Sequence, residues 1–309
     1  MTSTPRHLRS LLDLEPEAIH AILDRAQEMR VLRGTPEHGL PLAGKSVAIL
    51  LEKASTRTRV SFEVGIHELG ALPVTLIAKD TQLGRGEPLS DTARMFSGYV
   101  HAVVYRTFGH ERIEELAAAS TIPVINGLSA LYHPCQLLAD LLTLKQEFGA
   151  LEGLSVAWVG DGNNMAHSWM LAAGMVGLDL RLACPEGYQP EPSVLAQAQA
   201  LGRGSITLTT DPGQACEGAD VVTTDVWASM GQEEEAKLRL KAFAGFEVDD
   251  ALMARGAERA IFLHCLPAHR GEEVSASVID GPQSRVWREA ENRLHAQKAV
   301  MIRLMGRRR

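Results

Sequence analysis

Residues 46–70, which read SVAILLEKASTRTRVSFEVGIHELG, constrain the fold of this chain more than any other segment. Positions 47–51 form a continuous apolar run, as in a parallel strand that is covered on both faces. Phe62, Ile66 and Leu69 follow at helical spacing, and Gly70 is a suitable helix stop. A buried strand followed directly by a helix predicts a parallel α/β sheet.

The turn between this strand and helix is rich in hydroxyl groups and arginine. Ser55 is suited to cap the helix, so that the free backbone N–H groups of the first turn point outward. Ser55, Thr56, Arg57 and Thr58 therefore predict a site for a phosphate or a similar oxyanion. Arg57 and Arg59 project roughly 200° apart on a helix, so we expect Arg57 to be the ligand and Arg59 to form a supporting ion pair. A well-capped helix with a solvated basic start would give the same pattern.

Strand-like and helix-like segments alternate along the rest of the chain. Further strands are expected at residues 72–78, 102–105, 122–125, 154–159, 180–183, 206–209, 221–224 and 261–264. Helices are expected at residues 8–33, 56–69, 90–99, 110–120, 133–148, 164–175 and 284–305, and a mobile functional loop at 80–90. The alternation predicts an α/β fold with two doubly wound parallel-sheet domains and the active site in the interdomain cleft. We place the domains at residues 1–148 and 149–309, with the last helix packing back across the first domain.

Composition narrows the class of partner. The formal charge is 31 − 38 = −7, which argues against general affinity for nucleic acid or for a membrane surface. The four cysteines are dispersed and form no CxxC pair, so we expect a reducing, cytoplasmic setting without disulfides. We find no membrane-span signal and no signal-peptide core, and the acidic residues at 13, 15 and 17 argue against a mitochondrial presequence.

Ligands of open α/β sheets bind beyond the carboxyl ends of the strands. Polar residues that follow predicted strands are Arg106, Asn126, Asn164, Asp225 and Cys265. His133 and Gln136, three residues apart, either converge on a ligand at a helix N-terminus or form a variant capping box. Arg57 and Arg106 suit a phosphate, and the carboxylate of Asp225 suits an ammonium group. These residues predict one phosphate-bearing and one amine-bearing substrate.

Several common cofactors are not expected. Gly160 and Gly162 resemble the start of a dinucleotide fingerprint, but no third glycine follows, and no acid ends the next strand. No Walker lysine motif is present, and His264 and His269 do not have zinc-ligand spacing. We therefore expect neither a cofactor nor a metal.

Four motifs together resemble the ornithine branch of the carbamoyltransferase family. They are Ser-Thr-Arg-Thr-Arg at 55–59, His-Pro-Cys-Gln at 133–136, Asp225 with Ser-Met-Gly at 229–231, and His-Cys-Leu-Pro at 264–267. The first two mark the wider family, and the last two mark its ornithine branch. The similarity runs from about His7 to Met305, so we expect no transit peptide. Ala54, where a polar residue is common, and the short turn at 160–164 depart from the family pattern.

The resemblance implies the reaction of carbamoyl phosphate with L-ornithine to give L-citrulline and phosphate, in arginine biosynthesis. It implies a carbamoyl-phosphate-binding domain at residues 1–148 and an ornithine-binding domain at 149–309. It also implies a homotrimer or an assembly of trimers, with no cofactor. Two alternatives stay open: carbamoylation of another amine such as putrescine, and a non-catalytic phosphate-binding module on the same fold.

The resemblance also implies a role for each motif residue. Carbamoyl phosphate would be held by Ser55, Thr56, Arg57, Thr58, Gln82, Arg106, His133, Gln136, Cys265, Leu266 and Arg293. Gln82 would be supplied across a subunit interface. Ornithine would be held by Asn164, Asp225, Ser229 and Met230, with Asn163 as an alternative to Asn164. The catalytic residues would be Arg57, Arg106, His133 and Cys265. We expect Cys265 to orient the δ-amine as a wall of the site rather than to act as a nucleophile.

Overall fold

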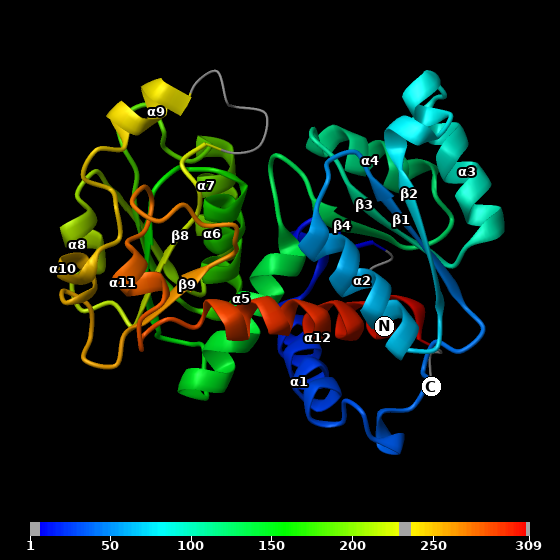
Figure 1. The fold of residues 1–309 in the computed structure, drawn as a ribbon, viewed down its shortest axis with the longest axis horizontal. Coiled ribbons are helices and arrows are strands. Elements are labelled where there is room, and N and C mark those ends of the chain that lie inside the picture. Colours follow the sequence, from blue (N-terminus) through cyan, green and yellow to red (C-terminus); the bar gives the residue numbers. More distant parts are fainter. Residues whose placement is uncertain (1–6, 229–235, 307–309) are drawn as a thin grey trace. The chain divides into compact units, whose positions relative to one another are not determined.

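The structure, a computed structural model, describes residues 7–228 and 236–306 (Figure 1). The chain divides into two compact units, and each contains one parallel sheet. Unit 1 comprises residues 1–142 together with 291–309, and unit 2 comprises residues 143–290. The predicted α/β class with two doubly wound parallel sheets is confirmed, whereas the location of the active site in a cleft stays a prediction.

Unit 1 contains a four-stranded sheet in the order β2-β1-β3-β4. Its strands are β1 (Ser46–Leu51), β2 (Leu72–Ile77), β3 (Ala102–Arg106) and β4 (Val124–Leu128). Its helices are α1 (Pro16–Val31), α2 (Thr56–Glu68), α3 (Leu89–Tyr99), α4 (His110–Ala119), most of α5 (Pro134–Phe148) and most of α12 (Val286–Met305). Short 3-10 helices lie at Leu11–Asp13, Pro36–His38, Ala78–Asp80 and Leu83–Arg85.

Unit 2 contains a five-stranded sheet in the order β7-β6-β5-β8-β9. Its strands are β5 (Ser155–Val159), β6 (Asp179–Ala183), β7 (Ser205–Thr209), β8 (Val221–Thr224) and β9 (Ile261–His264). Its helices are α6 (Asn164–Val176), α7 (Pro192–Leu201), α8 (Pro212–Cys216), α9 (Ala236–Ala242), α10 (Asp250–Met253) and α11 (Ala276–Ile279). In both sheets the chain moves outward from a central strand and then returns to its other side, as in doubly wound folds.

The opening strand and helix form as the sequence predicts. Positions 47–51 of β1 are all buried, and β1 lies between β2 and β3. Ser55 caps α2, because its Oγ accepts a hydrogen bond from the backbone N–H of Thr58 at 3.3 Å. Gly65 of α2 has no side chain where α12 passes, and a Cβ there would lie 3.3 Å from side-chain atoms of Leu294 and Lys298. The last helix therefore packs directly on the helix that begins at the candidate anion site.

Some predicted boundaries are wrong. The helix expected at 8–33 begins only at Pro16, because Leu8 forms a bridge to Ile125 at the edge of the sheet. The strand expected at 122–125 lies at Val124–Leu128. Helices α7 to α11 are short connections that the sequence analysis did not identify. None of the helices in the described part of the chain is long and apolar enough to span a membrane.

Candidate active site

The first group of candidate residues surrounds the N-terminus of α2 in unit 1. Thr58 is its centre and is fully buried. Its Oγ1 accepts hydrogen bonds from Ser55 Oγ at 3.0 Å, from Arg106 Nη1 at 3.3 Å and from Arg293 Nη2 at 3.3 Å. One hydroxyl thus holds two guanidinium groups beside the positive end of a helix. This concentration of positive charge favours an anion, above all one with two negative charges.

Arg293 extends this group to the start of α5. Its Nη1 donates to Gln136 Oε1 and lies 3.4 Å from His133 Nε2. Gln136 in turn donates to Asp140 Oδ1 at 2.8 Å. The side chains of His133 and Gln136 therefore both lie beside Arg293, and their convergence on a ligand stays a prediction. Arg293, His133 and Gln136 are each at least 96% buried, so their positions are fixed by packing as well as by hydrogen bonds.

His133 is held in its neutral form. Burial, and then the charges of Arg293 and Arg106, keep the pKa of His133 well below its ordinary value of 6.5. A guanidinium group has no acceptor, so Nε2 accepts from Arg293 and the neutral ring carries its proton on Nδ1. A neutral imidazole is a hydrogen-bond donor that adds no further positive charge.

The remaining candidates of unit 1 lie on more accessible positions. Arg59 forms the predicted ion pair, with Nε 2.9 Å from Glu63 Oε1, while Arg57 is half-buried. Thr56 and Gln82 are exposed, and Gln82 immediately precedes the short helix Leu83–Arg85. The ligand roles of Arg57, Thr56 and Gln82 stay predictions.

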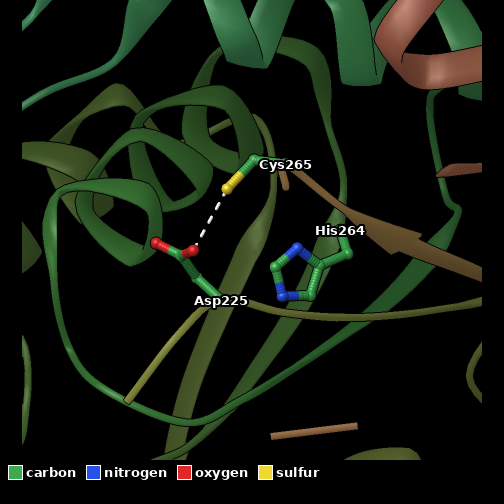
Figure 2. A group of neighbouring side chains, drawn as sticks. All are labelled: Asp225, His264 and Cys265. Carbon is green, nitrogen blue, oxygen red and sulfur yellow. Dashed lines mark hydrogen bonds between the residues drawn. The ribbon is translucent and has the colours of Figure 1, made fainter. Parts of the chain in front are cut away.

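The second group lies at the ends of β8 and β9 in unit 2, and Asp225 is its centre. Asp225 Oδ1 accepts hydrogen bonds from Cys265 Sγ at 3.1 Å, drawn in Figure 2, and from the backbone N–H of Val226 at 2.8 Å. Its Oδ2 accepts one from Asn163 Nδ2 at 3.0 Å. Asp225 is 7% exposed, so a carboxylate that can bind an ammonium group is held in place from three directions.

Asn163 and Asn164 have different positions. Asn163 is the N-cap of α6, and its Oδ1 accepts from the N–H groups of Met165 and Ala166 while its Nδ2 reaches Asp225. Asn164 is the first residue of that helix and is buried. Which of the two contacts substrate stays open. Ser229 and Met230 lie outside the described residues.

The loop that carries Cys265 and Leu266 is held by His264. Leu266 has a φ of 58°, in the left-handed region that side chains rarely adopt. Its N–H donates to His264 Nδ1 at 2.9 Å, and His264 Nε2 lies 3.3 Å from the buried carboxylate of Glu273. The N–H of His264 donates to Glu289 at 2.9 Å. The carboxylates of Glu273 and Glu289 therefore hold His264 in place, and His264 in turn holds the strained backbone at Leu266.

Among the residues that the structure describes, two groups of side chains have the composition of metal ligands. They are Asp225, His264 and Cys265 (Figure 2), and His269, Glu272 and Glu273, and within each group the potential ligand atoms lie within 4.8 Å of one another. Hydrogen bonds account for the first arrangement, because Cys265 donates to Asp225 and His264 Nδ1 accepts from Leu266. That the protein requires no metal stays a prediction.

The sequence analysis missed the residues that support both groups. They are Glu52, Arg112 and Asp140 in unit 1 and Glu273 and Glu289 in unit 2. Glu52 directly follows β1, so its place at a strand end was a signal that could have identified it. The other partners are distant in sequence, and no local pattern marks them.

Comparison with known proteins agrees with this architecture. The family model described as "Aspartate/ornithine carbamoyltransferase, carbamoyl-P binding domain" matches residues 6–146. The model described as "Aspartate/ornithine carbamoyltransferase, Asp/Orn binding domain" matches residues 152–304. The ornithine carbamoyltransferase of Geobacter metallireducens is 53% identical over 303 residues, which cover 97% of this chain and 99% of the relative. That of Halorhodospira halophila is 54% identical over 300 residues, with coverage of 97% and 99%.

Solved structures give the same result. Ornithine carbamoyltransferase from Pyrococcus furiosus is 47% identical, with a TM-score of 0.94 and complete coverage of both chains. The enzyme from Thermus thermophilus is 42% identical, with a TM-score of 0.89 and coverage of 97% of this chain and 99% of that one. Two parallel α/β units, one with paired arginines at a helix N-terminus, define a two-domain protein with a candidate anion site. The chain belongs to the aspartate/ornithine carbamoyltransferase family.

Proposed function

We propose that this protein transfers the carbamoyl group of carbamoyl phosphate to the δ-amine of L-ornithine, and that it releases L-citrulline and phosphate. The observation that carries the proposal is the pair of arginines, Arg106 and Arg293, on the hydroxyl of Thr58 at the start of α2. Relatives that are more than 50% identical over nearly the whole chain are named for ornithine. Arginine biosynthesis is the metabolic role that we expect for this reaction.

Unit 1 binds carbamoyl phosphate in this proposal. The phosphate group accepts from the N–H groups of the first turn of α2 and from Arg57 and Arg106. Gln82 adds a contact from a neighbouring subunit. The carbamoyl end lies near His133, Gln136 and Arg293. Neutral His133 and the guanidinium groups stabilise the negative charge that develops on the carbonyl oxygen, which is usually the largest single contribution to catalysis.

Unit 2 binds ornithine in this proposal. Asp225 accepts from the α-ammonium group, and Asn164, Ser229 and Met230 complete the recognition of the α-amino and α-carboxylate groups. Cys265 and Leu266 line the position of the δ-amine, which attacks as the free base. The C–N bond forms, the C–O bond breaks with its electron pair going to the departing phosphate, and the proton that the amine loses passes to that phosphate. The thiol of Cys265 donates to Asp225, which suits an orienting wall better than an attacking group.

Assembly and location are parts of the same proposal. We infer a homotrimer or a set of trimers, with Gln82 acting in the site of a neighbouring subunit. Support comes from large apolar side chains that are exposed on elements of unit 1, such as Leu72, at 63%, and Tyr99, at 76%. Light scattering on the purified protein measures the assembly directly. A cytoplasmic location is expected from the dispersed cysteines, all four of which are free thiols.

An assay for citrulline tests the function. Purified protein that receives carbamoyl phosphate and ornithine releases citrulline and phosphate in equal amounts. Putrescine lacks the α-carboxylate, so a faster reaction with putrescine than with ornithine would identify putrescine as the substrate. Stabilisation by phosphate without any carbamoylated product would instead identify a non-catalytic binding module.

A further inference from the structure

The side chain of Glu52 receives hydrogen bonds from three residues at the end of the neighbouring strand and the helix after it. Oε1 accepts from Tyr105 Oη at 2.8 Å and from Arg112 Nη2 at 2.6 Å. Oε2 accepts from Thr107 Oγ1 and from Arg112 Nε, the latter at 3.2 Å. The side chain is 12% exposed, so the carboxylate is largely removed from water. Such a set of donors fixes its geometry.

Arg106 lies between two of these partners. Side chains alternate between the faces of a strand, so Tyr105 and Thr107 project to one face and Arg106 to the other. The backbone of Glu52 also contributes, because its N–H donates to the carbonyl oxygen of Arg106 at 2.9 Å. Glu52 thus holds the residue before Arg106, the residue after it and its carbonyl group.

The opposite edge of β3 also determines the direction of Arg106. The register between β3 and β4 shifts at this point, with Tyr105 opposite Asn126 and Arg106 opposite Leu128. The extra residue is Gly127, where a Cβ would lie 3.3 Å from Val104 and 3.6 Å from Arg106 Cβ. A bulge changes the direction of the side chain beside it, and here that side chain reaches Thr58.

We propose that Glu52 is a positioning residue for carbamoyl transfer, which fixes the end of β3 so that Arg106 points at the carbamoyl phosphate site. This inference rests on the proposed function of that site. Glu52 itself touches no substrate, because its carboxylate lies on the face of the strand opposite to the Arg106 side chain.

Arg112 keeps the carboxylate of Glu52 in its charged form. Burial alone would raise the pKa of Glu52, but hydrogen bonds from Arg112, Thr107 and Tyr105 together hold it below its ordinary value. The charged form matters because each oxygen faces donors only. A glutamine at this position would replace one of the two oxygens with an NH2 group, which cannot accept a hydrogen bond. Tyr105 or Thr107 would then lose its acceptor.

The variant Glu52→Gln tests the proposal, with Glu63→Gln as the matched control. Glu63 also accepts from one arginine and one threonine in unit 1, namely Arg59 and Thr75, but it contacts neither Arg106 nor its neighbours in the described bonds. We expect Glu52→Gln to lower kcat/KM for carbamoyl phosphate by about 10–100-fold, with KM for ornithine within about twofold. Glu63→Gln should match the wild type. Equal losses in both variants would overturn the proposal.

A double-mutant cycle with Arg106→Ala separates positioning from a general structural effect. If Glu52 acts through Arg106, then adding Glu52→Gln to the Arg106→Ala variant should lower kcat/KM by less than about twofold. Multiplicative losses would show that Glu52 acts independently and would overturn the proposal. Tyr105→Phe and Thr107→Val each remove one bond and keep the Arg112 pair, so they give the same test if Glu52→Gln does not fold.

The affinity for inorganic phosphate, measured by calorimetry, provides a readout without turnover. We expect phosphate to bind more weakly to Glu52→Gln than to the wild type, and to bind Glu63→Gln with unchanged affinity. Wild-type protein that binds phosphate but makes no citrulline would defeat the proposed function alone. Wild-type turnover with an unaffected Glu52→Gln variant would defeat only the positioning role.

Discussion

Arg293 donates through Nη1 to the side-chain oxygen of Gln136, which lies 157 residues earlier in the chain. The same guanidinium reaches Thr58 Oγ1, so one side chain of α12 joins the first turns of α2 and α5. Both of these turns carry motifs that the sequence analysis identified separately. Arg293 is the residue that brings them into one site.

We expect Arg293→Ala to lower kcat/KM for carbamoyl phosphate by about 100-fold or more, because in the proposed mechanism this buried guanidinium stabilises the developing negative charge. Arg288→Ala is the control on the same helix. Its guanidinium lies 3.9 Å from Glu147 and its side chain is 41% exposed, so the loss of this pair should cost at most about 1 kcal/mol of stability. Steady-state kinetics of both variants checks the prediction, and equal rates would refute it.

Arg57 and Arg59 offer a comparison within one turn of helix. Arg57→Ala should remove about 2–4 kcal/mol of transition-state stabilisation, as the loss of a main oxyanion donor does. Arg59→Ala breaks only the surface pair with Glu63 and should change kcat/KM by less than about threefold. The ratio of the two kcat/KM values decides the matter. A mild effect of Arg57→Ala would mean that Arg57 is not the ligand arginine.

The neutral state of His133 has a consequence for acid stability. Its pKa is depressed in the folded protein, so below the ordinary value of 6.5 the unfolded chain binds a proton that the native state refuses. Stability therefore falls as the pH is lowered. Between pH 7.5 and pH 5.5 the wild type should therefore lose more stability than His133→Gln, which has no imidazole to protonate.

Urea unfolding at the two pH values measures this difference. His20→Gln, at an exposed position on α1, is the control for the loss of a histidine. If wild type and His133→Gln lose the same stability on acidification, His133 does not resist protonation.

Cys265→Ser discriminates between a wall and a nucleophile. A serine hydroxyl can donate to Asp225 in the same way as the thiol, so kcat/KM for ornithine should stay within about tenfold of the wild type. A covalent route would lose far more, because a hydroxyl is a much weaker nucleophile than a thiolate. Intact-mass spectrometry of the wild type with carbamoyl phosphate alone should show no carbamoyl adduct on the protein.

Sequence alone was sufficient where the determinants are local. The strand β1 and the cap at Ser55 follow from neighbouring residues, and the structure confirms them. The ion pair expected for Arg59 also forms, and its partner is Glu63, four residues later on the same helix. These features need no knowledge of the rest of the chain.

Sequence was insufficient where partners come from distant segments. The position of Glu52 after β1 was a local signal, but its pairing with Arg112, 60 residues away, could not be read from the sequence. Arg293 was indicated by the resemblance to a known family and not by any periodic pattern in the sequence. The left-handed backbone at Leu266 was also not foreseen, since it depends on His264 and on carboxylates at 273 and 289.

The group of side chains around Thr58 in unit 1 includes Arg293 of α12, which a ribosome would synthesise only after unit 2. All four strands of the sheet and the first turns of α2 and α5 precede residue 143, whereas Arg293 follows after the whole of unit 2. A polypeptide released before residue 293 would contain every strand of unit 1, yet Thr58 and Gln136 would lack the guanidinium that joins them. This group of side chains is thus complete only after unit 2 has been synthesised, and proteolytic cleavage just before residue 293 would remove Arg293 from it without cutting the sheet.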